Sequence, residues 1–223
     1  MQQQLYLTDT YLVEHKTTVA RSGRSEEGVA WLALAQNIFH PQGGGQPNDA
    51  GTVDGVAATP RRDAADREWI LVDLADAEQA PAEGSPVTAR VDLETRRLHA
   101  ALHTAGHLVD AFVRPLGFQH AGNSHFPGQA RVDYQLDGAQ PDRDELTAQI
   151  NAQLAEAVAA ALKVTSAVTD GVRRVSIEGL NTEPCGGTHV PDLGALQGVV
   201  LRSIKIKGGV MKVGYTAEHR ADR

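Results

Sequence analysis

The sequence contains a single cysteine, Cys185, among its 223 residues, so no disulfide can form within the chain. A lone thiol is typical of a reducing cytoplasm. There is also no run of the roughly 20 apolar residues that a membrane span needs, because Val29–Phe39 and Leu154–Val164 are too short or too polar. The first residues lack a basic region followed by an apolar core, so we expect no secretory signal and a cytoplasmic protein.

Positive charge is scarce as well. The chain has 21 Lys and Arg against 28 Asp and Glu, a net charge of −7. This balance argues against a protein that holds nucleic acid mainly through phosphate attraction. Basic residues nevertheless predominate after Leu196, where the charged residues are Arg202, Lys205, Lys207, Lys212, Arg220 and Arg223 against Glu218 and Asp222. This end is either a solvated surface or a local basic face.

The first ninety residues have the pattern of a β domain. With 41% hydrophobic and 22% charged residues, the chain is typical of a globular protein of one large or two small domains. Pro60–Glu68 and Asp76–Pro86 are polar, and we expect them to be irregular. The predicted strands contain Leu5–Leu7, Thr18–Ala20, Val29–Leu34, Ile38–Phe39, Ile70–Val72 and Val87–Val91. We therefore expect a small, barrel-like β domain over residues 1–91.

The pattern becomes partly helical from Asp92. Apolar residues recur at three- and four-residue steps from Leu98 to Phe112, which predicts a helix capped by Asp92 and ended near Pro115. A second helix is predicted to begin at Asp142 or at Pro141 beside it, since apolar residues repeat every four positions after them. Further strands are predicted at Ala130–Leu136, Val172–Ile177, Val199–Ile206 and Val210–Tyr215. The fold class is therefore α+β, with a second domain over residues 92–223.

Two short motifs carry residues that bind transition metals. His103 and His107 stand four apart in the first predicted helix, so both imidazoles can converge on one ion. Cys185 and His189 have the same spacing within a Gly-rich segment, where glycine permits tight folding. Each pair alone is a weak signal, because such residues are often structural. Together, three imidazoles and a thiolate form a ligand set that suits Zn²⁺.

The position of His99 leaves the choice of helical ligands open. His99 lies one turn before His103 on the same face. His99 and His107 are about 12 Å apart along the axis, too far to share an ion. The pair is therefore either His99 with His103 or His103 with His107.

Other hydrolytic motifs are missing. A zinc metalloprotease carries Glu directly after the first histidine, whereas this chain has Thr104 there. There is neither a serine nucleophile elbow nor a Walker-type phosphate loop. Chemistry at this site would therefore use a metal-bound water or a metal-oriented substrate.

The two paired motifs occur together with other recognisable segments. In order along the chain these are Pro41-Gln-Gly-Gly-Gly-Gln-Pro47, His103-Thr-Ala-Gly-His107, Asn123-Ser-His, Arg131-Val-Asp-Tyr134 and Cys185-Gly-Gly-Thr-His189. With these motifs the sequence resembles the AlaX-type alanyl-tRNA editing proteins, relatives of the editing domain of alanyl-tRNA synthetase. The Gly-rich segment is similar to that of longer members, which carry an extra N-terminal β domain.

The resemblance implies a zinc-dependent editing domain with one Zn²⁺ per chain. It selects His103, His107, Cys185 and His189 as ligands. It implies a trans-editing hydrolase that deacylates mischarged Ser-tRNA(Ala), with Gly-tRNA(Ala) as a further substrate. Two alternatives stay open, namely editing of Ser-tRNA(Thr) and a non-catalytic, zinc-stabilised RNA-binding module.

Thr104 is the candidate for serine selectivity. It lies about 100° around the helix from His103, at the edge of the metal-facing side. A hydroxyl there is placed to hydrogen-bond the serine side chain. The alternative is a bond from Thr104 to the carbonyl of Ala100, which is common for threonine within helices.

Gly44-Gly45-Gln46 matches the tripeptide that release factors use for peptidyl-tRNA hydrolysis. It forms either a tight turn or, as the resemblance implies, part of the pocket, with Gln46 catalytic and Gly44 and Gly45 binding substrate. Arg131 is a further substrate-binding candidate, unless it pairs with Asp133 on the same strand.

The remaining assignments concern three histidines and the lysines near the C-terminus. His189 is the ligand we expect to loosen if the metal needs an open position. His125 and His40 are expected to be structural, as isolated histidines usually are. The tRNA contacts are assigned to Lys205, Lys207 and Lys212. The resemblance leads us to expect arginine in that segment, and Arg binds phosphate differently from Lys.

Overall fold

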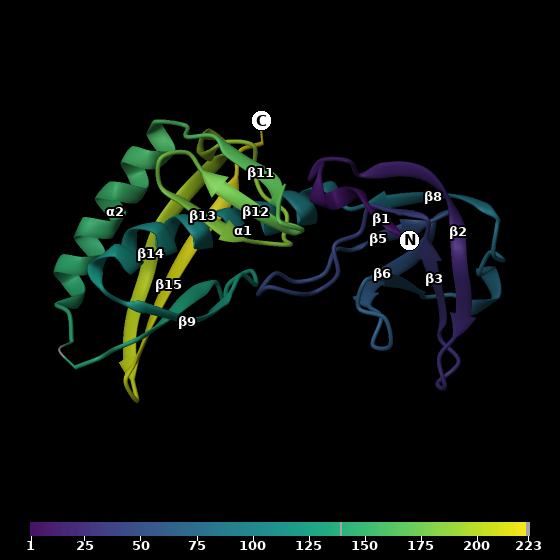
Figure 1. The fold of residues 1–223 in the computed structure, drawn as a ribbon, viewed down its shortest axis with the longest axis horizontal. Helices are drawn as coiled ribbons and strands as arrows, with labels where there is room; N and C mark the ends of the chain where they lie inside the picture. Colours follow the sequence, from purple (N-terminus) through teal and green to yellow (C-terminus); the bar gives the residue numbers. More distant parts are fainter. Residues whose placement is uncertain (139, 222–223) are drawn as a thin grey trace. The chain divides into compact units, whose positions relative to one another are not determined.

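The computed structural model describes residues 1–138 and 140–221, which form two compact units (Figure 1). The first unit comprises Met1–Gly43 and Pro47–Arg96, and the second comprises Gly44–Gln46 and Arg97–Arg223. The division thus falls inside a helix rather than at residue 92, and three residues of the Gly-rich segment count with the second unit. Whether residues 1–91 and 92–223 fold independently stays a prediction.

The first unit is a closed six-stranded barrel, in the order β2-β3-β7-β6-β5-β8. Its inward residues alternate along the strands: in β8, Val87, Ala89 and Val91 are buried and their neighbours are not. A short parallel pair, β1 with β4, lies outside the barrel. The strands are β1 (Gln3–Gln4), β2 (Glu14–Arg24), β3 (Ala30–Leu34), β4 (Gln36–Asn37), β5 (Gly51–Val53), β6 (Val56–Arg62), β7 (Ile70–Leu74) and β8 (Pro86–Val91).

Three local predictions for this unit were wrong. Leu5–Leu7 forms a turn of 3₁₀ helix, closed by the Thr8 N–H on the Leu5 carbonyl, instead of a strand. Ile38–Phe39 follows β4 without extending it. Pro60 lies within β6, opposite Val72, although proline and polar neighbours predicted a loop.

A buried ion pair holds the end of the Gly-rich segment to the start of the long helix. Arg96 is fully buried and donates hydrogen bonds to Asp49 and to the carbonyls of Thr10 and Ile38. Asp49 also accepts from the backbone N–H of His40. Asp49, Ile38 and His40 are buried and Thr10 is half-buried, and the cost of removing the two charges from water is offset by a nearly complete set of hydrogen bonds.

In the second unit, two helices and two sheets surround one core. Helix α2 packs along β14 of the four-stranded sheet β14-β15-β10-β9 (Figure 1). The other sheet has the order β11-β12-β13. The elements are α1 (Leu93–Val113), β9 (Gln119–Ser124), β10 (Arg131–Gln135), α2 (Arg143–Ala159), β11 (Val164–Thr169), β12 (Val172–Ile177), β13 (Asn181–Pro184), β14 (Leu196–Lys207) and β15 (Val210–His219), with 3₁₀ turns at Arg114–Leu116 and Leu193–Ala195. The 3₁₀ turn at Ala77–Gln79 and the start of α1, up to Arg96, belong to the first unit.

The predicted helix starts are confirmed. The Asp92 carboxylate accepts from the Thr95 N–H, and the Asp142 carboxylate accepts from the N–H groups two and three residues later. The α+β class with an N-terminal barrel is likewise as predicted. Across residues 1–138 and 140–221, every helix is too short or too polar to traverse a bilayer.

Candidate metal centre and adjoining cavity

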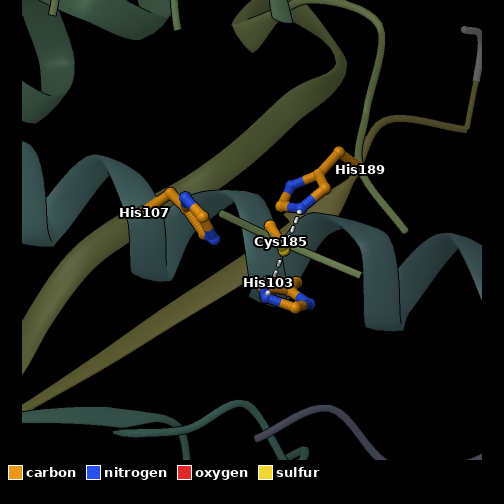
Figure 2. A group of neighbouring side chains, drawn as sticks. All are labelled: His103, His107, Cys185 and His189. Carbon is orange, nitrogen blue, oxygen red and sulfur yellow. Dashed lines mark hydrogen bonds between the residues drawn. The ribbon is translucent and has the colours of Figure 1, made fainter. Parts of the chain in front are cut away.

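Four side chains of the second unit converge on one point (Figure 2). His103 and His107 project from α1, and Cys185 and His189 from the loop after β13; their ligand atoms all lie within 4.8 Å of one another. Cys185 Sγ is 3.2 Å from His189 Nε2 and 3.5 Å from His103 Nε2. Atoms that share one tetrahedral zinc lie about 3.3–3.6 Å apart, so the group fits a single ion. His99 is not part of this group.

The loop that carries Cys185 has a steric requirement for glycine. A Cβ atom on Gly187 would lie 2.1 Å from Cε1 of His103, so no other residue fits there. The Gly187 N–H donates to Cys185 Sγ at 3.3 Å, and Arg173 Nη1 donates to the carbonyls of Cys185 and Gly187. These bonds fix the direction of the sulfur atom.

Gln46 holds the imidazole of His103. Its Oε1 lies 2.7 Å from His103 Nδ1 and also accepts from the Thr188 N–H, while its Nε2 donates to the Thr188 hydroxyl. An amide oxygen only accepts, so His103 Nδ1 must carry the proton. His103 Nε2 therefore presents its lone pair to the metal position. Gln46 is fully buried and acts through His103, which differs from the direct catalytic role expected from the sequence.

Thr104 holds the imidazole of His189 by a hydrogen bond, as Gln46 holds that of His103. Its hydroxyl donates to the carbonyl of Ala100 at 2.8 Å, lies 3.1 Å from His189 Nδ1 and accepts from the Val190 N–H at 3.2 Å. Because its single proton is used on Ala100, His189 Nδ1 is the donor in their bond, and His189 Nε2 is left as the ligand atom. The side chain is fully buried and its hydrogen-bonding capacity is filled. It has no free valence for a substrate hydroxyl, so the alternative bond to Ala100 describes Thr104.

The protonation of the ligands follows from burial. Desolvation lowers the pKa of His107, only partly opposed by the charge of Asp110, and keeps the imidazole neutral as a ligand must be. Desolvation also raises the pKa of the Cys185 thiol, although the Gly187 N–H works the other way. Burial therefore favours the neutral forms of the Cys185 thiol and the His107 imidazole, and binding of a divalent cation would displace the thiol proton.

A cavity of about 320 Å³ adjoins the centre at His107. This volume is at the lower end for small-molecule sites, about 300–1,000 Å³. Two carboxylates on its wall are paired with basic side chains: Asp110 with His120 and Arg114, and Glu183 with Arg114. The hydrogen bond to Asp110 raises the pKa of His120. The lining residues are Gly106, His107, Asp110, Arg114, His120, Asn123, His125, Val132, Glu183 and Pro184.

His125 is a functional candidate that the sequence did not distinguish from a structural histidine. Its ring stacks on that of His103, with centroids 4.3 Å apart, and its Nδ1 lies 2.6 Å from the Tyr215 hydroxyl. Tyr215 donates its own proton to the carbonyl of Leu102, so His125 Nδ1 is the donor of their bond. Desolvation lowers the pKa of His125 to about 3, which keeps the ring neutral. Only its place as the last residue of the Asn123-Ser-His segment could have indicated it.

Gly44, Gly45 and Arg131, the other predicted substrate-binding residues, are not among the residues lining the cavity. Gly44 and Gly45 have positive φ values of 57° and 81°, and they form the turn that presents Gln46 to His103. A Cβ on Gly45 would lie 2.0 Å from Asn123 Oδ1. Arg131 pairs with Asp133.

The three predicted tRNA contacts share one exposed stretch of the β14–β15 hairpin. Lys205 lies directly opposite Lys212, and Lys207 follows two residues after Lys205, on the same face. Like charges opposite each other in a sheet repel. The hairpin therefore presents a basic strip that an anionic partner would stabilise.

No protein-family model matches the chain. Over 93% of its length it is 26% identical to the alanyl-tRNA editing protein AlaX-M of Methanosarcina mazei, 93% of which is covered. Over 99% of its length it is 27% identical to the alanyl-tRNA editing protein AlaX-L of Pyrococcus horikoshii, of which it covers 59%. It is also 26% identical, over 96% of its length, to the alanine–tRNA ligase of Halobacterium salinarum, of which it covers 26%.

Proposed function

Since this chain is an AlaX-type protein by its sequence, we propose that it is a trans-editing hydrolase acting on mischarged tRNA(Ala). The finer proposal is that it deacylates Ser-tRNA(Ala), and Gly-tRNA(Ala) more weakly, with one Zn²⁺ bound per chain. The observation that carries the proposal is the paired support of the ligands. Gln46 and Thr104 commit His103 and His189 to present Nε2 toward Cys185, beside a cavity.

A synthetase that selects alanine faces a discrimination problem that binding in one pocket cannot solve. A pocket built for alanine rejects serine poorly, because serine adds only one hydroxyl, and it cannot exclude the smaller glycine. A second site must recognise the wrong product and cleave its ester. Hydrolysis transfers the hydroxyl of water to the carbonyl carbon, and the ribose oxygen of the tRNA leaves with a proton.

Different groups of residues would bind the metal, the aminoacyl group and the tRNA. A bound Zn²⁺ would supply a Lewis acid and a local positive charge, held by His103, His107, Cys185 and His189. Asp110 and Glu183 give the cavity wall two carboxylates against one guanidinium, that of Arg114, and the excess of negative charge favours the ammonium group of an aminoacyl ester. The Lys205, Lys207 and Lys212 strip is placed to meet tRNA phosphates.

The two alternative functions differ from this proposal in the substrate that is hydrolysed or in the absence of hydrolysis. A protein that edits Ser-tRNA(Thr) would hydrolyse that substrate in preference, and a zinc-stabilised RNA-binding module would bind tRNA without hydrolysing any ester. The cavity beside His107 favours catalysis, since a purely structural zinc needs no adjoining cavity.

The deciding experiment is deacylation by the purified, zinc-loaded protein, with metal content measured on the same sample. We expect about one zinc per chain and hydrolysis of Ser-tRNA(Ala), with Ala-tRNA(Ala) and Ser-tRNA(Thr) spared. The Cys185→Ala variant should lose both metal and activity. Hydrolysis of Ser-tRNA(Thr) alone would replace the substrate in the proposal, and binding without hydrolysis would replace the function.

A further inference from the structure

A group other than Thr104 must bind the serine hydroxyl, because the hydroxyl of Thr104 is fully hydrogen-bonded within the protein. All three hydrogen-bonding positions of its hydroxyl are filled by Ala100, His189 and Val190. A selective site needs a polar group that is buried, unfilled and in contact with the bound side chain. The residues that line the cavity next to His107 are where such a group must lie.

His125 has these properties. It lines the cavity, is only 2% exposed and uses Nδ1 as a donor to Tyr215. Within the described part of the chain, its Nε2 makes no hydrogen bond. In a neutral ring with the proton on Nδ1, Nε2 can only accept. The ring thus brings one unfilled acceptor to the cavity.

The position of this ring is tightly fixed. It stacks on His103, and a Cβ on Gly106 would lie 2.4 Å from its Cε1. A Cβ on Gly45 would lie 3.0 Å from its Cδ2. Two glycines therefore make room for the imidazole on either side of Nε2, and Tyr215 sets its tautomer.

We propose that Nε2 of His125 accepts a hydrogen bond from the side-chain hydroxyl of the seryl ester and so determines selectivity for serine. This inference rests on the proposed editing function. A neutral acceptor matches a neutral hydroxyl, whereas the ammonium group of the same ester is better matched by Asp110 and Glu183. Alanine and glycine esters have no hydroxyl and leave the buried acceptor unpaired, which disfavours their binding.

The first test is His125→Phe, which keeps a ring that can stack on His103 and removes the acceptor. We expect kcat/KM on Ser-tRNA(Ala) to fall about three- to tenfold relative to Gly-tRNA(Ala), the range for removing one neutral hydrogen bond, with zinc retained. The control is His120→Phe, the same substitution at the cavity histidine that pairs with Asp110, which should leave the serine-to-glycine ratio unchanged. An equal decrease on both substrates for His125→Phe would show contact with a ribose hydroxyl or a structural role, and would overturn the proposal.

A second measurement does not depend on turnover or on the variant folding. Nitrogen-15 NMR of zinc-loaded, histidine-labelled protein should show His125 protonated at Nδ1. Adding 3′-seryl-amino-3′-deoxyadenosine, a stable amide analogue of the aminoacyl terminus, should shift the Nε2 resonance. The glycyl analogue should not. Equal shifts, or none with the seryl analogue bound, contradict the assignment. If the wild-type protein hydrolyses no ester, the proposed function fails, and this experiment still tests the contact.

Discussion

Gln46 and His103, 57 residues apart in the sequence, share a hydrogen bond of 2.7 Å between Oε1 and Nδ1. The bond explains why a Gly-rich turn and a helical histidine belong to one site. Gly44 and Gly45 adopt positive φ values that bring Gln46 to the imidazole, and Thr188 fixes both ends of its amide. The Gly-rich turn therefore positions His103, one residue of the candidate metal centre.

This relationship predicts a loss of metal affinity in Gln46→Met. The methionine keeps the length of the side chain but removes the acceptor that fixes His103, so the zinc dissociation constant should rise about 10- to 100-fold. Competition with a chromogenic chelator measures this constant. Gln42→Met, at an exposed position of the same segment, is the control and should bind zinc as the wild type does. Equal affinities for the two variants would deny Gln46 a supporting role.

Thr104→Val should act on the fold and the metal rather than on selectivity. It leaves His189 Nδ1 and the Val190 N–H without an acceptor, which should lower the free energy of unfolding by about 1–3 kcal/mol. Rates on Ser-tRNA and Gly-tRNA should fall by the same factor.

The control is Thr147→Val, because Thr147 makes the same bond to a carbonyl four residues earlier on an exposed face of α2. Its effect should stay within about 0.5 kcal/mol. If Thr104→Val slowed hydrolysis of Ser-tRNA but not of Gly-tRNA, the Thr104 hydroxyl would be the group that recognises serine.

The pair of Arg96 and Asp49 should dominate the stability of the first unit. Asp49→Asn leaves the buried guanidinium without its counter-charge, and we expect the free energy of unfolding in urea to fall by about 3–5 kcal/mol. The matched change Glu14→Gln breaks the exposed pair with Arg90, worth about 0–1 kcal/mol. Similar decreases for both variants would contradict the importance of burial.

Stability of the metal-free protein should fall on acidification below about pH 6.5. His125 has a pKa near 3 in the folded state against 6.5 for an exposed histidine, so the unfolded chain binds the proton first. Its contribution is complete above pH 6.5 and is lost as the pH falls toward 3, by at most about 1.4 kcal/mol per pH unit. The lowered pKa of His107 acts in the same direction.

Urea unfolding at a series of pH values measures this slope. His125→Phe removes one titrating group. The slope of the free energy of unfolding against pH, between pH 6 and 4, should therefore decrease by up to about 1.4 kcal/mol per pH unit, the value for one proton. An unchanged slope would mean that His125 is not buried in its neutral form.

The basic strip should determine the salt dependence of tRNA binding. Replacing Lys205, Lys207 and Lys212 with Ala should reduce the slope of log affinity against log salt by about 0.7–0.9 for each lysine–phosphate interaction that is removed. Lys163→Ala, an exposed lysine on the approach to β11, is the control and should leave the slope unchanged. If the triple variant keeps the wild-type slope, tRNA binds to another surface.

The sequence by itself determined the features that depend on local spacing. A four-residue interval places His103 and His107 on one side of any helix, and apolar periodicity with Asp92 and Asp142 as caps defines α1 and α2. Alternation likewise predicts β8, whose inward residues fill the barrel. Strand β11 escaped prediction because it is mostly exposed and has no alternation to detect.

Only the tertiary structure decided what the neighbouring polar residues do. Thr104, Gln46 and His125 owe their roles to bonds with His189, His103 and Tyr215, which lie 85, 57 and 90 residues away in the chain. No periodicity encodes such a contact, and a hydroxyl, an amide or an imidazole can either hold a ligand or touch a substrate. The choice depends on which lone pairs and protons the folded neighbours have already used.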